Sequence, residues 1–425
     1  MSVPVRPMTA KAQRTPVRRK VAARAAAAGA VSTKKQSGKS AKSPLASSRD
    51  YETVVLVLQG GGALGAYQCG VYEGLHEAGI RPDWFAGISI GAINAAILAG
   101  NAPEHRVERL RQFWERISTP ALPLPKLAFD WQRQWLDALP KSGILSSWTS
   151  AFDAWTSLLH GQTGFFVPRT PPPFAAPAGS AAATSFYSAA PLRKTLAEFV
   201  DFDRINQASV RFTVGAVNVR SGNFVYFDNR KTKIRLEHVL ASAALPPAFA
   251  AVEIDGEFYW DGGVVSNTPL EYVIEQAPRR DTLALQVDLW SARGALPRTL
   301  GDVFERQKDI QYSSRTRSGT DNAAERQCLR LALGQLVAQL PQKRFPAALA
   351  KVFEAWTCTK VVNIVHLIYE AKSYEEQYKD YAFGPVTMNE HWSAGLGDMQ
   401  RTLAHPKYFA MPSRDVGVTT HDVHR

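Results

Sequence analysis

Two strand-turn-helix patterns follow one another near the start of the chain and restrict its fold more than any other feature. Residues 53–59 form a continuous apolar run, which is typical of a parallel strand buried on both faces. The stretch GGGALG at 60–65 leads into a helical pattern that stops at Gly79. WFAGIS at 84–89 and IGAINAAILAG at 90–100 repeat the arrangement. Strands that alternate with helices predict a mostly parallel sheet with helices on both faces.

The alternation continues to about residue 290, so we predict one α/β domain over 51–290. A chain of 425 residues with 45% hydrophobic content is long enough to bury a core of this size. Later strands are expected at 211–219, 224–228 and 282–289, and helices at 104–117, 191–200, 235–244 and 268–276.

Two regions depart from this alternation. Residues 118–185 are rich in proline and carry four of the ten tryptophans, followed by two phenylalanines: Trp131, Trp135, Trp148, Trp155, Phe165 and Phe166. We interpret this insertion as a second hydrophobic cluster over the sheet. The alternative is a mobile lid or an interfacial surface, because such aromatic residues favour the lipid headgroup boundary. Residues 299–385 have a long, charged helical pattern, so 291–425 is expected to be a helical extension packed on the α/β domain.

The net charge of +12 is concentrated in the first 50 residues. They hold twelve Lys/Arg and one acid, which leaves 38 basic and 37 acidic residues for 51–425. The segment is rich in Ala, Ser and Pro and has no aromatic residue before Tyr51. We therefore expect residues 1–50 to form a disordered basic tail. Such a tail can be a solubilising arm, a tether to anionic lipid or nucleic acid, or an organelle address.

The cysteines and the apolar runs bear on the compartment. Cys69, Cys328 and Cys358 are odd in number and widely spaced, which favours neither a disulfide framework nor a zinc site. This usage fits a reducing compartment. No apolar run in the sequence reaches the roughly 18–20 residues that span a bilayer. We expect a cytoplasmic protein, with peripheral contact to an anionic membrane as an option.

The glycine loop alone has more than one interpretation. Gly60, Gly62 and Gly65 have the spacing of a dinucleotide-binding fingerprint, and Asp83 falls about 20 residues further on. That aspartate precedes the second strand, whereas the acid that binds a ribose should follow it. A P-loop does not fit, because no Gly-Lys-Ser/Thr follows the glycines. A nucleotide-dependent oxidoreductase stays open, supported by these glycines only.

The second turn, GISIG at 87–91, favours a different chemistry. Gly-x-Ser-x-Gly between a strand and a helix is a nucleophile elbow, which exposes its serine, here Ser89, at the top of a sheet. The two turns are expected side by side at the carboxyl ends of neighbouring strands. Amides of the glycine loop would then face the carbonyl oxygen that Ser89 attacks, so the glycines predict an oxyanion hole.

A nucleophilic serine needs a base. None of the nine histidines stands at the end of an expected strand. Two Asp-Gly pairs are better placed. Asp255-Gly256 between strand-like residues is typical of a hairpin turn, and Asp261 follows the aromatic strand FYW. Asp261 is therefore the candidate base, with a role in the turn alone as the alternative.

Taken in order, GGGALG at 60–65, GISIG at 87–91 and DGG at 261–263 resemble the patatin-like phospholipases. ASAALPPAF at 241–249 and SNTPL at 266–270 are also similar to that family. The resemblance implies a three-layer α/β/α hydrolase with a mostly parallel sheet and a Ser–Asp dyad without a catalytic histidine.

The likeness covers about 53–290 of the chain. Beyond it, DIQYSSRTR at 309–317 and the ending GVTTHDVHR resemble an extension found in a bacterial branch of the family. The C-terminal part is therefore expected to belong to the same protein type.

The resemblance also implies roles for individual residues. Ser89 would attack a lipid or phospholipid carboxylic ester to form an acyl-enzyme, and Asp261 would take its proton. The oxyanion hole is expected among Gly60, Gly61, Gly62, Ala63 and Ile90, with further motif glycines at Gly65, Gly87, Gly91, Gly262 and Gly263. No metal, organic cofactor or specific nucleic acid is implied.

One position departs from the family pattern, because Leu64 stands where the family often has Arg or Lys. The cation that would orient the loop or meet an anionic substrate is missing there. Ester hydrolysis is therefore better supported than a preference for phospholipid. The remaining alternative is a non-catalytic protein that keeps the fold and binds a lipid or polymer surface.

Overall fold

The first expected strand lies inside a mostly parallel sheet. The computed structural model describes residues 42–119, 154–313, 316–339, 346–370 and 378–423. Within these ranges a nine-stranded sheet has the order β11-β10-β9-β1-β2-β5-β8-β7, with β6 beside β5. Its strands are β1 (Thr53–Leu58), β2 (Trp84–Gly87), β5 (Arg211–Asn218), β6 (Phe224–Asp228), β7 (Val252–Ile254), β8 (Glu257–Asp261), β9 (Thr282–Asp288), β10 (Val362–Ile368) and β11 (Val418–Asp422). A separate ribbon pairs β3 (Val167–Pro168) with β4 (Tyr187–Ser188).

Strands β11, β10, β9, β1, β2 and β5 pair in parallel, whereas β6, β8 and β7 are antiparallel. The five strands expected from the sequence are all present. The hairpin expected at Asp255-Gly256 joins β7 to β8, and both residues have the positive φ that a tight two-residue turn requires. The prediction of a mostly parallel sheet is confirmed.

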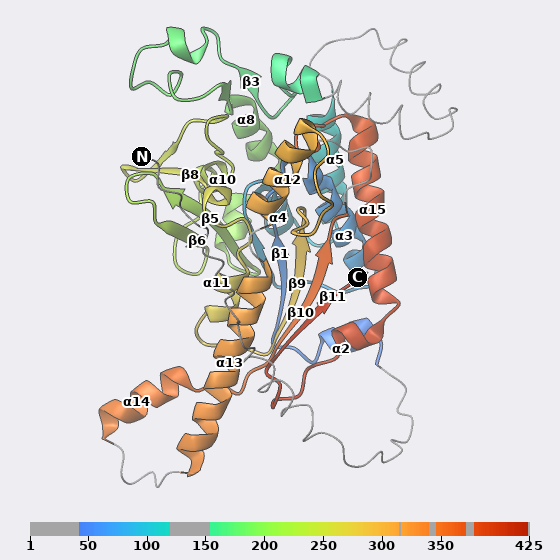
Figure 1. The fold of residues 1–425 in the computed structure, drawn as a ribbon, viewed down its shortest axis with the longest axis vertical. Coiled ribbons are helices and arrows are strands. Elements are labelled where there is room, and N and C mark those ends of the chain that lie inside the picture. Colours follow the sequence, from blue (N-terminus) through green and yellow to red (C-terminus); the bar gives the residue numbers. More distant parts are fainter. Residues whose placement is uncertain (1–41, 120–153, 314–315, 340–345, 371–377, 424–425) are drawn as a thin grey trace, which may run out of the picture. The chain divides into compact units, whose positions relative to one another are not determined.

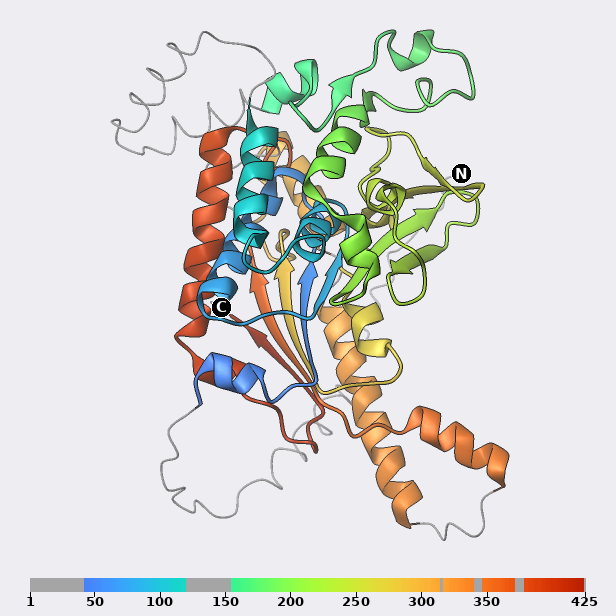
Figure 2. The ribbon, with the colours of Figure 1, turned by 180° about the vertical axis from the view of Figure 1, so that it is seen from behind.

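Helices cover both faces of the sheet, as the two opposite views in Figures 1 and 2 show. They are α2 (Pro44–Ser48), α3 (Ala66–Glu77), α4 (Ile90–Ala99), α5 (Arg106–Ser118), α8 (Ala190–Phe199), α9 (Phe202–Asn206), α10 (Leu236–Ser242), α11 (Leu270–Glu275), α12 (Leu300–Tyr312), α13 (Thr316–Gln339), α14 (Ala347–Trp356) and α15 (Pro385–Leu403), with short turns η1 (Gly62–Gly65), η2 (Pro173–Ala175), η3 (Gly262–Val264) and η5 (Pro406–Phe409). Within the described ranges, none of these helices combines the length and the apolar composition that crossing a membrane requires.

The side chains of β1 divide between two hydrophobic clusters, one on each face of the sheet. Leu56 and Leu58 belong to the larger cluster, which includes side chains of α3, α4, α5 and α15. Val55 and Val57 belong to the smaller cluster, which includes side chains of α11 and α13. A strand whose alternate residues are buried on opposite faces reads as one apolar run, as the sequence does here. The result is a three-layer α/β/α arrangement.

The C-terminal helix α15 packs directly on α3. A Cβ on Gly395 would lie 2.0 Å from Tyr67 O, and a Cβ on Gly70 would lie 1.9 Å from Trp392 O. Both positions therefore need glycine, because the two backbones approach too closely for any side chain. This contact attaches the C-terminal region to the α/β core.

The sequence analysis expected the C-terminal region to be helical, but the region also contributes strands. Helices α12 to α15 are present, but β10 and β11 also extend the parallel sheet beyond β9. The sequence analysis missed β10 because Asn363 and His366 interrupt its apolar pattern. Asn363 is nonetheless buried, since its Nδ2 donates to the Tyr51 hydroxyl and to two backbone carbonyls.

The prediction of a disordered tail over residues 1–50 is wrong for the last residues of that segment. Residues 44–48 form α2, whose first turn is capped by the Ser43 side chain. Ser47 and Ser48 are buried, so this segment belongs to the folded part of the chain. Residues 1–41 lie outside the described residues, and the tail remains an expectation there.

The insertion expected at 118–185 is described only in part. Residues 120–153, with Trp131, Trp135 and Trp148, lie outside the described residues. In the described part, Phe165 and Phe166 are buried and their rings contact Phe383.

Candidate active site

The elbow turn connects β2 to α4 and holds Ser89 in a strained conformation. Ser89 has φ 56° and ψ −125°, and such a backbone costs a non-glycine residue about 1–3 kcal/mol. A Cβ on Gly87 would lie 2.2 Å from Gly91 O, and a Cβ on Gly91 would lie 2.3 Å from Leu58 O. The Gly-x-Ser-x-Gly spacing therefore follows from the tightness of the turn. Ser89 also stands at the N-terminus of α4, where the helix dipole favours negative charge.

Ser242 on α10 anchors this turn to the sheet. The Ser89 amide donates to Ser242 O at 3.1 Å and to Ser242 Oγ at 3.2 Å. Ser242 Oγ in turn donates to Gly215 O on β5 at 2.7 Å. The sequence analysis quoted this serine only within the pattern at 241–249 and assigned it no role.

The register along β5 explains why Asp261 meets Ser89. β6 occupies one edge of β5, and β2 and β8 share the other. β2 ends with Gly87 opposite Val214, and β8 ends with Asp261 opposite Ala216. The elbow that leaves β2 and the carboxylate that ends β8 therefore come together, although they are far apart in the sequence.

Asp261 is 1% exposed, and its two carboxylate oxygens differ in their surroundings. Oδ1 accepts the amide of Gly263 at 2.7 Å. Oδ2 is buried and has no hydrogen-bond partner among the residues that the structure describes. Burial raises the pKa of Asp261 to about 7, and the Ser89 hydroxyl and the Gly263 amide partly oppose that rise. Ser89 is thus near enough to influence the carboxylate, although the two side chains do not form a tight hydrogen bond.

Two of the five amides expected in the oxyanion hole already donate hydrogen bonds. The Gly60 amide donates to Asn267 O at 3.2 Å, and the Ala63 amide donates to Asp380 O at 2.9 Å. Each residue has one backbone N–H, so these two amides are not available to a substrate oxygen. Gly60 and Ala63 are therefore dropped as candidate donors.

The other three expected amides belong to Gly61, Gly62 and Ile90. They donate to no acceptor in the described part of the chain. All three residues line the cavity that contains Ser89 and Asp261. A side chain at Gly62 is excluded twice, because φ is 56° and a Cβ would lie 2.3 Å from Asp380 O. The candidate oxyanion hole is reduced to these three amides.

The remaining motif glycines allow close packing around the site. A Cβ on Gly65 would lie 2.5 Å from Ile90 Cγ1, and a Cβ on Gly262 would lie 2.8 Å from Gly215 O. Gly263 supplies the amide that Asp261 accepts and also lines the cavity.

The cavity has a volume of about 90 Å³, and most of its wall is apolar or aromatic. Phe165 and Phe166 of the insertion form part of this wall. Another part comes from beyond the sequence-predicted α/β domain, namely Tyr312, Asp380, Tyr381 and Phe383. The sequence analysis missed these residues and also Trp290, because no local motif marks them and only the fold brings them to the site. It quoted Asn267 only within the pattern SNTPL at 266–270 and assigned it no role.

Two further expectations concern Leu64 and the histidines. Leu64 is fully buried in the larger hydrophobic cluster and does not line the cavity. Among the described residues, no histidine lines the cavity either. His366 instead lies between Asp288 and Asp422, where it joins β9, β10 and β11.

The comparison with protein families confirms the family resemblance of the sequence. A family model described as Patatin-like phospholipase matches residues 56–274, more than half of the chain. The chain belongs to the patatin-like phospholipase family. A second model, described as Patatin phospholipase, matches residues 310–415, so this patatin-like chain carries family features in both its core and its C-terminal region.

Curated relatives match short stretches only. Patatin-like phospholipase domain-containing protein 6 from Homo sapiens is 37% identical over 70 residues, which is 16% of this chain and 5% of that protein. Lysophospholipase nte1 from Aspergillus terreus is 54% identical over 50 residues, 12% of this chain and 3% of that protein. The chain therefore matches only a small part of these relatives' length. Among solved structures, VipD from Legionella pneumophila matches with a TM-score of 0.35 and 14% identity, over 83% of this chain and 67% of that one.

Proposed function

We propose that this patatin-like protein hydrolyses carboxylic ester bonds of lipids, with Ser89 as the nucleophile and Asp261 as the base. One observation carries the proposal. A serine in a strained elbow and a buried carboxylate with an unpartnered oxygen line the same mostly apolar cavity. This is the geometry expected of an activated nucleophile beside its base.

In the first half of the reaction, Ser89 Oγ attacks the ester carbonyl carbon and its proton passes to Asp261. The carbonyl oxygen becomes an oxyanion that accepts hydrogen bonds from the amides of Gly61, Gly62 and Ile90. The tetrahedral intermediate then collapses and expels the alcohol, which takes the proton from Asp261. The acyl group remains on Ser89.

In the second half, Asp261 takes a proton from a water molecule, and the resulting nucleophile attacks the acyl carbonyl. Collapse of this intermediate releases the fatty acid and returns the proton to Ser89 Oγ. The chain's own groups supply each proton transfer, so the cycle balances with water as the second substrate.

The environment of Asp261 suits it to this role. A carboxylate with an ordinary pKa is too weak a base to accept a serine proton efficiently. Burial raises the pKa of Asp261 to about 7. The carboxylate thereby gains basicity and is still ionised above neutral pH.

We infer a long-chain acyl substrate from the mostly apolar wall of the cavity. The family match supports cleavage of its ester in the manner of a lipase or phospholipase A. The same insertion that contributes Phe165 and Phe166 to that wall exposes Trp155 and Phe174 to solvent, and Phe186, which directly follows it, is also exposed. Exposed aromatic residues of this kind favour the headgroup boundary of a membrane. Peripheral contact of this segment with a lipid surface is part of the proposal.

Reaction with a fluorophosphonate tests the proposal most directly. The reagent should label the parent chain at Ser89 with loss of fluoride, and Ser89→Ala should abolish both labelling and hydrolysis of a soluble acyl ester. A chain that binds liposomes but neither reacts nor hydrolyses would instead be the non-catalytic surface binder. A flavin or nicotinamide absorbance in the purified protein would revive the oxidoreductase alternative.

A further inference from the structure

Two buried side chains hold the carbonyl of Gly60. Asn267 Nδ2 and Trp290 Nε1 each donate to Gly60 O at 2.8 Å. Both residues are 3% exposed, so water does not compete for these hydrogen bonds. The two donors occupy both lone pairs of the oxygen, so they fix the orientation of the Gly60 carbonyl.

The direction of this carbonyl also sets the direction of the next amide. The Gly60–Gly61 bond is not among the cis peptides of the structure. In a trans peptide the C=O and the following N–H point to opposite sides of one rigid plane. Gly60 O and the Gly61 N–H therefore turn together.

The Gly61 amide needs such a constraint. It donates to no acceptor in the described part of the chain, and Gly61 lines the cavity with Ser89. Glycine restricts its own backbone least of all residues, so a peptide between two glycines is not oriented by local sterics. Its direction must come from contacts to the rest of the fold.

We propose that Asn267 and Trp290 are positioning residues that orient the Gly61 amide toward the oxyanion through the carbonyl of Gly60. The inference rests on the proposed function, in which Gly61 is an oxyanion donor. An oxyanion hole is effective because its donors are oriented before the reaction begins. Loss of either side-chain donor would let the Gly60–Gly61 peptide rotate and would weaken that donor.

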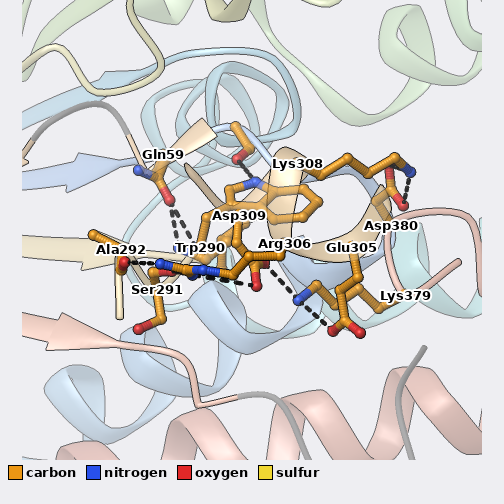
Figure 3. A network of polar contacts seen from close by, with 12 residues as sticks. Gln59, Trp290, Ser291, Ala292, Glu305, Arg306, Lys308, Asp309, Lys379 and Asp380 are labelled. Carbon is orange, nitrogen blue, oxygen red and sulfur yellow. Dashed lines mark hydrogen bonds and ion pairs between the residues drawn. The ribbon is translucent and has the colours of Figure 1, made fainter. Parts of the chain in front are cut away.

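Both the backbone and the indole ring of Trp290 are held by neighbouring residues. Gln59 Oε1 accepts the Trp290 backbone amide at 3.0 Å, and the ammonium of Lys379 lies 5.2 Å from the centre of the indole. Lys379 is buried and forms ion pairs with Glu305 and Asp309 of α12, as Figure 3 shows. Because the lysine is paired, it stays over the ring and limits the movement of the indole.

Asn267 is also held by the C-terminal region. Its Nδ2 donates a second hydrogen bond, at 3.0 Å, to Tyr312 O at the end of α12. The ring of Tyr312 lies 5.3 Å from that of Trp290, so the two supports touch one another. Residues outside the α/β domain predicted from the sequence therefore help to orient the oxyanion donor.

The test uses the full chain with two single substitutions. Trp290→Phe removes the indole N–H and keeps an aromatic ring, and Asn267→Ala removes the amide. We would measure kcat and KM on a soluble short-chain ester. We would also measure inhibition by an alkyl trifluoromethyl ketone, which adds Ser89 Oγ and becomes a tetrahedral oxyanion. We expect kcat to fall on the order of 10- to 100-fold. The inhibition constant should rise by a similar factor, with little change in KM.

Matched controls separate positioning from a general loss of packing. Trp84→Phe removes a buried indole hydrogen bond to Thr213 Oγ1 at 3.0 Å, and Asn363→Ala removes a buried amide. Neither residue contacts Gly60. Melting temperatures should fall in the controls as in the test variants, but only the test variants should weaken inhibition by the ketone.

Two outcomes would overturn the inference while leaving the proposed function intact. One is a parent-like kcat and inhibition constant in Trp290→Phe and Asn267→Ala, together with a large loss in Gly61→Ala. The other is a rise in KM alone, which would assign the two residues to substrate binding. Hydrolysis by Ser89→Ala would contradict the proposed function itself.

Discussion

Gly87 and Asp261 lie two positions apart along one edge of β5, since they pair with Val214 and Ala216. A parallel strand and an antiparallel strand thus end at the same point of the sheet. The candidate nucleophile and base are placed by strand register rather than by flexible loops. Groups supported in this way keep their geometry with little conformational freedom to lose.

The candidate dyad leads to a first prediction. Ser89→Ala should abolish hydrolysis of a p-nitrophenyl ester, and Asp261→Asn should lower kcat by about 100- to 10,000-fold, the usual range for a lost general base. His238→Gln is a suitable control, because this buried histidine lies on α10 and does not line the cavity. If a histidine variant that stays folded lost as much activity as Asp261→Asn, the Ser–Asp assignment would be wrong and a triad with that histidine would replace it.

The pH dependence of activity follows from the pKa of Asp261, which burial raises to about 7. Asp261 must be ionised to take a proton from Ser89, so kcat/KM should fall as the pH drops below about 7 and level off above it. A profile of kcat/KM against pH on a soluble ester measures this limb. A fall of kcat/KM centred near the ordinary pKa of an aspartate would show that burial does not raise the pKa of the base.

The same shift predicts a trade-off between activity and stability. Folding raises the pKa of Asp261, so the folded state holds this proton more tightly than the unfolded state does. Stability is therefore lost as the pH rises from about 4 to about 7. Asp261→Asn carries no such charge, so it should melt above the parent at pH 8. Identical melting temperatures at that pH would contradict a costly buried carboxylate.

A further prediction concerns the glycine loop. Gly61→Ala would bring a Cβ to 2.7 Å from Leu289 Cδ1 and to 2.9 Å from Leu289 Cβ, so either Leu289 or the loop must shift, and we expect the loop to do so because Leu289 is buried. We expect kcat to fall by about 100- to 1000-fold, as for other lost oxyanion donors, with a smaller change in KM. Gly222→Ala is the matched control: φ is 69° and nothing lies within 4 Å of a Cβ there. It should cost some stability and leave kcat unchanged, whereas an effect of Gly61→Ala on KM alone would indicate a binding loop.

His366 leads to a prediction about stability at alkaline pH. Burial alone would lower the pKa of His366, but the carboxylates of Asp288 and Asp422 outweigh it and raise the pKa to about 9. The stability from this charge is fully present below the unfolded pKa of about 6.5 and is lost as the pH rises through about 9. Melting temperature should therefore fall over this range in the parent. His366→Gln should lower the melting temperature at pH 7 and remove most of that dependence, and an unchanged slope would show that His366 is neutral.

The last prediction concerns the basic segment, which holds ten of its twelve Lys/Arg within residues 1–41. Because 44–48 form α2, the deletion should stop at residue 41. The shortened chain should sediment less with anionic liposomes and lose salt dependence, since each basic residue near such a surface contributes about 1 kcal/mol. Hydrolysis of a soluble ester should not change. Equal sedimentation of both chains at low salt would leave this segment as a solubilising arm or an address.

Much of the core was predictable because its signals are local. The buried run of β1 and the tight turn at Gly87–Gly91 each depend on neighbours within a few residues, so composition and spacing reveal them. The strand β10 was missed for the opposite reason. Asn363 and His366 are tolerated in a buried strand only because Tyr51, Asp288 and Asp422 bring partners from distant segments.

The same division holds at the candidate site. By itself, the sequence determined the elbow serine, the glycine loop and the aspartate after FYW, because each is a short motif with a local geometric requirement. The tertiary structure decided which amides are available, since Gly60 and Ala63 are engaged by Asn267 and Asp380 from remote parts of the chain. It also decided the basicity of Asp261, because burial is a property of the packed fold and not of the residues adjacent in sequence.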